Sequence, residues 1–341
     1  LAALATVCDM MPLREENRTI VVHGLRRMNE GARPGIRTLL IAAGEPIDGI
    51  DEETIGFVIG PRLNAPGRLG SAKPGLQLLR SKDRKTARPL AKAVEALNAT
   101  RKEYQRGTVD AALSKLASDP TTKHRSALVV AGEDWIPGVV GIAANGVVDE
   151  YRRPALVLAI DTDTGLARGS VRSYGAVDVR AALYECRDLL ERFGGHKAAA
   201  GATIQATKIP ELCDRFDVAV AKQIAAAESS DVEVVDMQLD LGDITQRFIT
   251  DMRSMAPYGV GFDRPRFVTG KVTVVEARVL KDKHLALTVT DQRHKREAIA
   301  FGQAHHNIHE SDCIRLAFAP RVDTWNGRRR VKLHVDRLWR C

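Results

Sequence analysis

The longest regular pattern of apolar positions runs from Ser81 to Leu116. This stretch is rich in Ala, Lys, Arg, Glu and Leu, and its apolar residues recur at nearly helical spacing, at Leu90, Val94, Leu97, Tyr104, Val109, Ala112, Leu113 and Leu116. Such spacing predicts one long helix with an apolar stripe and a charged, solvated face. Pro89 lies near its beginning, and we expect a first turn or a break there.

Short apolar runs alternate with helical patterns between residues 119 and 228. We predict strands over Ala127–Ala131, Pro154–Ile160 and Thr203–Gln205, and helices over Ile142–Tyr151, Val179–Phe193 and Ile209–Ala227. The segment Gly132–Gly141 is predicted to be a loop that leads into the first of these helices. Strands that alternate with helices in this way predict an α/β layer.

The last third of the chain shows a different pattern, in which strand signals follow one another. A polar linker is predicted over Glu228–Val235. Strands are predicted over Met237–Leu241, Phe267–Leu280, Leu285–Val289, Arg296–Phe301, Ile314–Ala319 and Arg330–Val335. Several short strands at regular spacing predict a small β-barrel.

The first third of the chain is harder to interpret. Leu1–Val7 is wholly apolar and is predicted to be a buried strand or the start of a helix, which presents Asp9 at its end. An amphipathic helix is predicted from Glu15 to Met28. The segment Gly60–Gly70 contains three glycines and two prolines, so we predict an irregular loop there.

Two arginines in the predicted loop, Arg62 and Arg68, are candidates for an anion site. A guanidinium group matches the geometry of a phosphate, and a rigid loop can hold two of them at fixed positions. Solvated arginines on a surface loop would give the same pattern. The segment Phe193–Gly201, with Gly194-Gly195-His196 at its centre, offers a second candidate, because main-chain N–H groups and an imidazole can converge on an anion at a glycine turn. The competing interpretation is a glycine-rich helix end with a bystander histidine.

Composition favours an acidic partner. The chain has 51 Lys and Arg against 43 Asp and Glu, which gives a formal net charge of +8 and a pI of about 9.3. Aromatic residues make up only 5%, so stacking of bases on many aromatic platforms is not expected. The five cysteines form no Cys-x-x-Cys motif, which favours reduced thiols in the cytoplasm. No apolar run is long enough to span a membrane, and because the sequence begins with Leu1 we expect a fragment.

Several motifs together resemble one family. Gly169-Ser170-Val171-Arg172-Ser173 followed by Gly194-Gly195-His196 is similar to the DHHA1 domain of the DHH phosphoesterase superfamily. Asn64-Ala65-Pro66-Gly67-Arg68 resembles the signature of the RecJ family of single-strand-specific exonucleases. Thr6–Leu13 and Lys283–Leu287 resemble two further segments of that family. Ile136 and Asn145-Gly146 depart from its pattern, which usually has His and Ser-Arg there.

The resemblance implies an α/β fold in four parts. These are a C-terminal remnant of a DHH domain (residues 1–80), a long connecting helix (81–118), a DHHA1 α/β domain (119–228) and an OB-like β-barrel that binds nucleic acid (229–341). In the family the motifs Asp-x-Asp and Asp-His-His, which supply most metal ligands, precede the point where this chain begins. We therefore expect this chain alone to be inactive.

The resemblance also implies an activity and its residues. The complete protein would be a 5′-to-3′ exonuclease of DNA repair and recombination that hydrolyses phosphodiesters with Mn²⁺ or Mg²⁺. Asp9 would be a metal ligand, and His196 would act near the scissile phosphate. Arg68, Ser170, Arg172 and Gly195 would hold the 5′ phosphate, and Arg62, Asn64, Ser173 and Gly194 of the same motifs are further candidates for contact with the phosphate or the strand. Apart from the resemblance, Arg328 and Arg329 form a basic hairpin tip that suits a phosphate groove, and an exposed turn explains them equally well.

Two other functions stay open at this point. One is a non-catalytic DNA-binding scaffold derived from RecJ, and the other is a phosphodiesterase that acts on oligonucleotides or cyclic dinucleotides. The barrel weighs against the latter. The expected partner is single-stranded DNA, with a single-strand-binding protein or a helicase as a further partner, no membrane, and a monomeric state.

Overall fold

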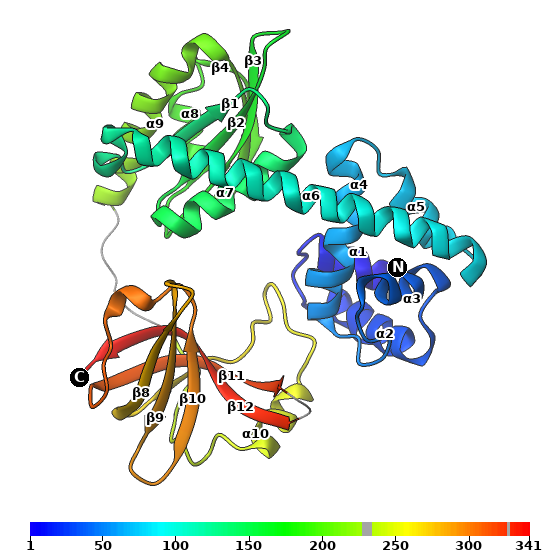
Figure 1. Cartoon of the computed structure of the whole chain (residues 1–341), viewed down its shortest axis with the longest axis vertical. Coiled ribbons are helices and arrows are strands. Elements are labelled where there is room, and N and C mark those ends of the chain that lie inside the picture. Colours follow the sequence, from blue (N-terminus) through cyan, green and yellow to red (C-terminus); the bar gives the residue numbers. More distant parts are fainter. Residues whose placement is uncertain (227–233, 326–327) are drawn as a thin grey trace. The chain divides into compact units, whose positions relative to one another are not determined.

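The structure is a computed structural model, and it describes residues 1–226, 234–325 and 328–341, with side chains omitted for residues 323–329. Contacts divide the chain into two units (Figure 1). The helix–sheet unit comprises residues 29–230. The barrel unit comprises residues 1–28 together with 231–341. The helix α2 (Glu15–Gly31) crosses the boundary between them.

The helix–sheet unit begins with helices. They are α3 (Pro34–Ala43), a π-helical turn η1 (Thr54–Ile59), α4 (Gly60–Leu69), α5 (Lys73–Arg80) and α6 (Arg84–Ser118), followed by a 3₁₀ turn η2 (Pro120–His124). α6 confirms the long helix predicted over 81–116. It begins at the cap Asp83, whose carboxylate accepts the N–H of Thr86 at 2.8 Å, and it continues through Pro89 without the predicted break.

The loop predicted over Gly60–Gly70 is wrong, because most of it forms α4. Pro61 lies in the first turn of α4. N–H groups there have no acceptor within the helix, so the N–H that proline lacks costs no hydrogen bond. Pro66 lies inside the helix, and its ring is buried. Local propensity is a weak constraint that packing against neighbouring helices overrides.

A buried ion pair joins α4 to α6. The Arg62 Nε donates to Glu95 Oε2 at 2.5 Å, and the two side chains are only 10% and 28% exposed. A guanidinium N–H of Arg62 also donates to the carbonyl of Val58 at 3.0 Å. Arg62 therefore supports the helical layer from within.

A five-stranded sheet fills the rest of this unit. Its strands are β1 (Leu128–Gly132), β2 (Ala155–Asp161), β3 (Leu166–Arg172), β4 (Leu190–Gly195) and β5 (Ala199–Gln205), in the order β1-β2-β3-β5-β4. β1 and β2 are parallel and are joined by the helix α7 (Pro137–Tyr151), whereas the other neighbours are antiparallel. The helices α8 (Val179–Glu185) and α9 (Ile209–Ala226) follow, with a 3₁₀ turn η3 (Ala206–Lys208) before α9.

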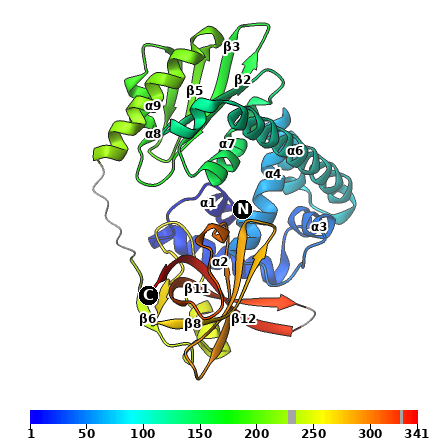
Figure 2. The same cartoon turned by 60° about the vertical axis from the view of Figure 1, so that its left-hand side comes forward.

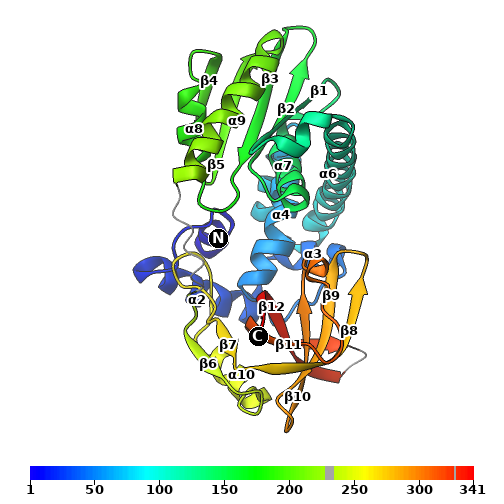
Figure 3. The same cartoon turned by 90° about the vertical axis from the view of Figure 1, so that its left-hand side faces the viewer.

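Helices cover both faces of this sheet, which confirms the predicted α/β layer (Figure 3). Because side chains alternate along a strand, β2 contributes to two cores. Ala155, Val157 and Ala159 pack with α6 and α7, and Leu156 and Leu158 pack with α8 and α9. α7 begins at Pro137, inside the segment predicted to be a loop.

Two strands of the sheet were not predicted. Gly169–Arg172, for which no strand was predicted, lies within β3, and the helix predicted over Val179–Phe193 ends at Glu185. Gly194 and Gly195 therefore close a strand and do not cap a helix. Gly195 has φ of 144° and an ideal Cβ there would lie 2.5 Å from the carbonyl oxygen of Ala199, so only glycine fits this hairpin.

The barrel unit confirms the predicted small barrel, which has the connectivity of an OB-fold (Figure 2). Five strands form the barrel, namely β8 (Val272–Leu280), β9 (His284–Thr290), β10 (Lys295–Ala300), β11 (Cys313–Trp325) and β12 (Arg328–Arg340). The sheet closes because β12 pairs with β10 in parallel and with β11 in antiparallel fashion, and β11 in turn pairs with β8.

Shorter elements complete this unit. The single strand predicted over Phe267–Leu280 is two strands, β7 (Phe267–Thr269) and β8, and β6 (Met237–Leu239) is the first of the sheet. The helix α10 (Gln246–Arg253) and the 3₁₀ turn η4 (Ala304–His306) also belong here. Residues 228–233 of the predicted linker lie outside the described residues.

The first 28 residues pack against the barrel part of the chain. α1 (Ala2–Cys8) decides the strand-or-helix alternative for Leu1–Val7 in favour of a helix. The N–H of Leu13 donates to the carbonyl of Val260 at 2.6 Å, and Arg18 donates to the carbonyl of Pro257 at 2.6 Å. The Arg18 guanidinium lies 3.8 Å from the centre of the Phe262 ring.

No helix in the described part of the chain is long and apolar enough to cross a membrane.

The ion pair between Arg62 and Glu95 yields a stability prediction. Arg62→Ala leaves the carboxylate of Glu95 unpaired in a largely buried position, so we expect the free energy of unfolding of the helix–sheet unit to fall by about 3–5 kcal/mol. Replacing both residues with Met should recover most of that loss, since no charge then remains buried. Urea unfolding read by Trp135 fluorescence, with Trp325 and Trp339 replaced by Phe, measures this. Equal losses in the single and double variants would contradict the prediction.

Candidate anion-binding site

The first turn of α7 lies against the last turn of α4. An ideal Cβ on Gly138 would lie 2.1 Å from the carbonyl oxygen of Arg68, so only glycine permits this approach. The Arg68 guanidinium donates to the carbonyl of Gly138 at 3.0 Å. The contact fixes an arginine from α4 beside the N-terminus of a 15-residue helix.

A second glycine, Gly141, lets β3 approach the same turn. An ideal Cβ on Gly141 would lie 3.0 Å from a guanidinium nitrogen of Arg172 and 3.1 Å from the hydroxyl of Ser170. Ser170 and Arg172 are two positions apart on β3, so both face α7. The structure therefore brings Arg68, Ser170 and Arg172 together around residues 138–141, as the sequence motifs predict.

The sheet beside these side chains is open. Ser170, Gly201 and Gly194 lie opposite one another on β3, β5 and β4, so two of the three positions in this row have no side chain. The turn that follows Gly195 carries His196, which is exposed; its N–H donates to the carbonyl of Ala199 at 2.8 Å. Because Arg172 pairs with Ala199, this turn lies at the same end of the sheet as Arg172.

The charges at this site are uncompensated. Partial burial lowers the pKa of Arg172, and the nearby charge of Arg68 lowers it further. Within residues 29–226, neither guanidinium group forms an ion pair with a carboxylate. Both also lie beside the positive end of the α7 dipole, which disfavours cations. An anion bound here would offset all three of these costs.

A third cation, Arg101, adds to the excess. It lies on α6 with only 8% of its surface exposed, and it donates to Asn98 Oδ1 and Gln105 Oε1, each at 2.7 Å. Both partners are neutral amides. Burial is the main cause that lowers the pKa of Arg101, and the charges of Arg68 and Arg62 lower it further. Arginine stays protonated at neutral pH, so the site holds three cations without a carboxylate partner in the described part of the unit.

Arg101 was missed in the sequence, although a signal was present. The buried stripe of α6 includes Val94, Asn98, Arg101, Thr108 and Ala112. At this spacing Asn98 and Arg101 lie in the stripe of an amphipathic helix that is normally apolar. A cation in the buried stripe of a predicted helix is rare unless it is paired, and so it marks a functional candidate.

The other predicted contacts lie differently. Arg62 is neutralised by Glu95 inside the helical layer, so we withdraw it from the predicted phosphate contacts. Asn64 is exposed on α4. The hydroxyl of Ser173 donates to the carbonyl of Val177 at 2.5 Å and shapes the loop after β3. Arg328 and Arg329 begin β12, but their side chains lie outside the described ones.

The departures from the family pattern fall on α7. Ile136 is the half-buried cap residue before the first turn, and Asn145 is exposed. Gly146 lies against α6, where an ideal Cβ would be 2.9 Å from a methyl group of Val109. The glycine therefore serves helix packing.

The predicted metal ligand Asp9 is exposed at the C-terminal end of α1, in the barrel unit. The structure brings no three His, Cys, Asp or Glu residues into a metal-binding group within the described ranges. A divalent ion needs several such ligands. The described residues therefore do not by themselves form a metal centre.

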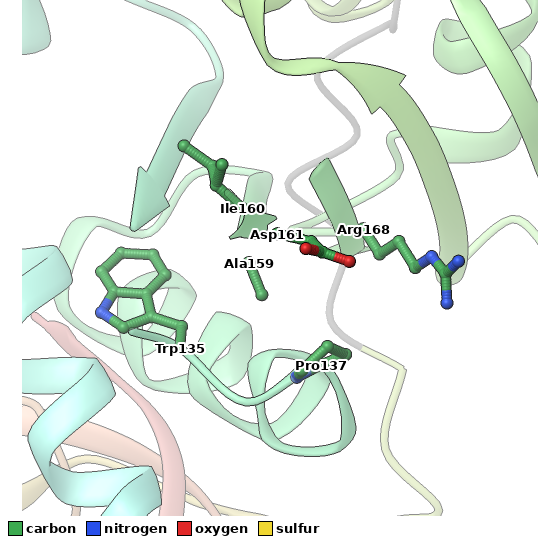
Figure 4. Close-up of a pocket in the computed structure, with 6 residues that line it drawn as sticks. All are labelled: Trp135, Pro137, Ala159, Ile160, Asp161 and Arg168. Carbon is green, nitrogen blue, oxygen red and sulfur yellow. The ribbon is translucent and has the colours of Figure 1, made fainter. Parts of the chain in front are cut away.

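A pocket of about 270 Å³ lies near the site, at the carboxyl ends of β1 and β2 (Figure 4). Trp135 and Pro137 line one side, and Asp161 and Arg168 line the other. Hydrogen bonds from Thr164 hold the pKa of Asp161 below its usual range, so this carboxylate is charged at neutral pH. Asp161 and Arg168 offset each other in charge, so this pocket lacks the excess of cations found around residues 138–141.

Comparisons with known proteins identify the two domains of this chain. Residues 124–222 match the DHHA1 domain family, and residues 235–337 match the RecJ OB domain family. The chain is 33% identical over 339 residues to the single-stranded-DNA-specific exonuclease RecJ of Bacillus subtilis, and 32% identical over 350 residues to RecJ of Dickeya dadantii. These matches cover 98% and 99% of this chain but only 43% and 60% of the relatives.

Solved structures give the same result. The crystal structures of Thermus thermophilus RecJ in complex with Mn²⁺ and with Mg²⁺ superpose with TM-scores of 0.80 and 0.79, at 29% and 28% identity. They cover 99% and 98% of this chain and 48% and 51% of the solved chains. The chain thus spans about half the length of the proteins it matches. Over that span it is a member of the RecJ family, with a DHHA1 domain followed by a RecJ OB domain.

Proposed function

We propose that this chain serves a single-stranded-DNA-specific exonuclease that acts from the 5′ end, in DNA repair and recombination. The observation that carries the proposal is that Arg68 and Arg172 meet at the start of α7, with Arg101 of α6 close enough to Arg68 for their charges to interact, and that none of the three has a carboxylate partner among the described residues. In this proposal, the DHHA1 domain holds the end of the strand and the barrel holds its length.

The charge of the site favours a terminal phosphate. A phosphate monoester carries between one and two negative charges at neutral pH, whereas an internal diester carries one. Three cations and a helix N-terminus therefore stabilise a terminal group more than an internal one. A pocket that prefers the terminal group selects the end of the strand, and this sets the polarity of degradation.

Each residue then has a distinct task. Arg68 and Arg172 donate hydrogen bonds to the phosphate oxygens, and the Ser170 hydroxyl donates another. The open row at Gly194 and Gly201 admits the strand beside them. His196, on its exposed turn, is proposed to act near the phosphate that reacts.

Metal chemistry enters through the complete protein. Related RecJ structures contain Mn²⁺ or Mg²⁺, and such ions lower the pKa of a bound water and polarise a phosphoryl oxygen. Asp9 is the one residue here that we propose as a ligand. Because the described residues form no metal centre, the remaining metal ligands would come from other parts of the complete protein.

A non-catalytic DNA-binding scaffold is the second candidate. The absence of a three-ligand metal group from the described ranges favours it for this chain taken alone. A cytoplasmic monomer that works with a single-strand-binding protein or a helicase is the setting that we propose for either function.

The first functional prediction concerns activity. A protein of residues 1–341 should bind single-stranded DNA but release no nucleotides with Mn²⁺, because its described residues supply too few metal ligands. Acid-soluble release from a labelled strand measures this, with and without EDTA. Release that EDTA abolishes would show that the chain is catalytically complete.

The second functional prediction concerns the strand end. Arg172→Ala should weaken binding of a 5′-phosphorylated oligonucleotide by about 1.5–3 kcal/mol, the worth of a charge-assisted hydrogen bond, and should leave binding of the 5′-hydroxyl strand nearly unchanged. Fluorescence anisotropy with both strands measures the two affinities. In a complete enzyme His196→Ala should slow cleavage of both strands, since it acts on the reacting phosphate.

Matched variants on α6 serve as controls. Arg101→Met should also reduce the preference for the 5′ phosphate, by less than Arg172→Ala because Arg101 acts at longer range. Arg106→Met removes the same charge from an exposed position of the same helix and should keep the preference. An unchanged preference in Arg172→Ala would show that the phosphate binds elsewhere.

A further inference from the structure

The outer face of the barrel carries an exposed aromatic ring. Leu285, Ala300 and Val335 of β9, β10 and β12 belong to the barrel core, so the residues that alternate with them point outward. Phe301 directly follows β10 and is 57% exposed. A single exposed ring is common on a protein surface, so the significance of Phe301 depends on the residues around it.

Two histidines hold this ring in place. The His284 ring lies 5.3 Å from the Phe301 ring at an interplanar angle of 76°, and the His334 ring lies 5.7 Å from it at 63°. These are edge-to-face contacts. The N–H of Gly302 donates to His284 Nδ1 at 3.0 Å, which fixes the His284 ring and assigns Nδ1 as the acceptor. Two neighbouring rings therefore hold Phe301 while more than half of its surface stays in contact with solvent.

Cations line the same face of the barrel. Glu297 lies opposite Lys332, and Lys295 lies opposite Thr290 two residues along β10. The Arg330 guanidinium donates to Glu297 at 2.9 Å, which pairs this cation with a carboxylate, and Lys295 and Lys332 are further basic residues of this face. A held aromatic ring at one end of a face, followed by basic residues, matches what a single strand offers, which is an unstacked base and then phosphates. In OB-folds the second and third strands, here β9 and β10, form the nucleic-acid face.

We propose that Phe301, held by His284 and His334, is a stacking platform for one unpaired base of a single-stranded nucleic acid. The inference rests on the proposed function, since it assumes that the chain binds single strands. It adds a contact to the base, whereas the arginine site contacts only phosphate. Stacking is tolerant of sequence, because every base has a π-face.

An abasic strand separates stacking from backbone attraction. We would measure affinity for a dT strand of about 12 nucleotides, within the span of one OB-fold, and for a strand of the same length with abasic sites, using wild type, Phe301→Ala and Phe301→Trp. Phe301→Ala should weaken binding of dT by about 5- to 150-fold and leave the abasic strand unchanged, and Phe301→Trp should restore the dT affinity. Phe57→Ala, which removes a 78% exposed ring of the helix–sheet unit, is the matched control.

The outcomes distinguish the platform from the function beneath it. If wild type does not bind the dT strand, the proposed function fails. If wild type binds it and Phe301→Ala binds equally well, or loses the same factor on both strands, the platform is wrong and the function stands.

A separate observation concerns two cysteines at the edge of the barrel. Ile314 of β11 pairs with Arg340 of β12, so Cys313 and Cys341 lie opposite each other one position further on. The N–H of Cys341 donates to the carbonyl of Cys313 at 3.0 Å. Both are exposed, and a hydrogen bond between the thiols raises the pKa of Cys313. Opposite residues of a hydrogen-bonded pair have Cα atoms about 5.5 Å apart, within the range that a disulfide spans.

We infer that Cys313 and Cys341 form a disulfide on exposure to a peroxide. The two thiols lose two protons and two electrons, one S–S bond forms, and hydrogen peroxide is reduced to two waters. The bond would join the two strands that close the barrel. Because Cys8, Cys186 and Cys213 are at least partly buried, this pair should react before them.

Thiol counting tests the inference. Treatment of the folded chain with hydrogen peroxide should lower the number of titratable thiols from five to three, with a monomer on a non-reducing gel and the 313–341 link found by mass spectrometry. Cys313→Ser should keep its four thiols under the same treatment. A covalent dimer, or a loss of two thiols in Cys313→Ser, would overturn the pairing.

Discussion

The close contact between Gly138 and the carbonyl of Arg68 is the constraint on which the proposed phosphate site depends. With 2.1 Å between that oxygen and an ideal Cβ, any larger residue would separate α4 from α7. Arg68 would then leave the helix N-terminus, and the neighbours that meet it there would lose their common centre. Gly141 acts more weakly toward β3, since an ideal Cβ there would lie 3.0 and 3.1 Å from the side chains of Arg172 and Ser170. Gly138 and Gly141 thus allow α4 and β3 to approach the first turn of α7. This packing positions the charged side chains.

The same arrangement weakens the fold where it builds the site. Like charges at the start of α7 repel one another, and burial of Arg101 carries a desolvation cost that its amide partners only partly offset. Arg62 shows the alternative, since its partner Glu95 neutralises it in a comparable position. Placing a carboxylate beside Arg68 or Arg172 would stabilise the fold in the same way, but it would also occupy the charge that a phosphate needs. Stability and binding therefore make opposite demands on these positions.

The spacing of apolar residues was sufficient to predict those helices and strands whose buried side chains follow that spacing. The long helix, the α/β layer and the barrel could be predicted because each repeats its pattern over many residues. The pattern failed in short glycine- and proline-rich segments. The Gly60–Gly70 segment is a helix because the neighbouring α6 supports it, and Gly194–Gly195 belong to a strand because β5 lies beside them. Ser170, Arg172 and Arg68 could be found by motif, whereas the role of Arg62 and Arg101 depends on partners outside any local pattern.

The barrel unit is built from both ends of the sequence, and this affects the order in which the chain can fold. Arg14 donates to the carbonyl of Gly261, 247 positions later, and Arg18 to that of Pro257, 239 positions later. At ribosomal speeds of about 5–20 residues per second, these contacts wait roughly 12 to 50 seconds after Arg14 is made. The intervening helix–sheet unit is complete before then. It can therefore fold on the ribosome while residues 1–28 still lack Phe262 and their other packing partners in the barrel unit.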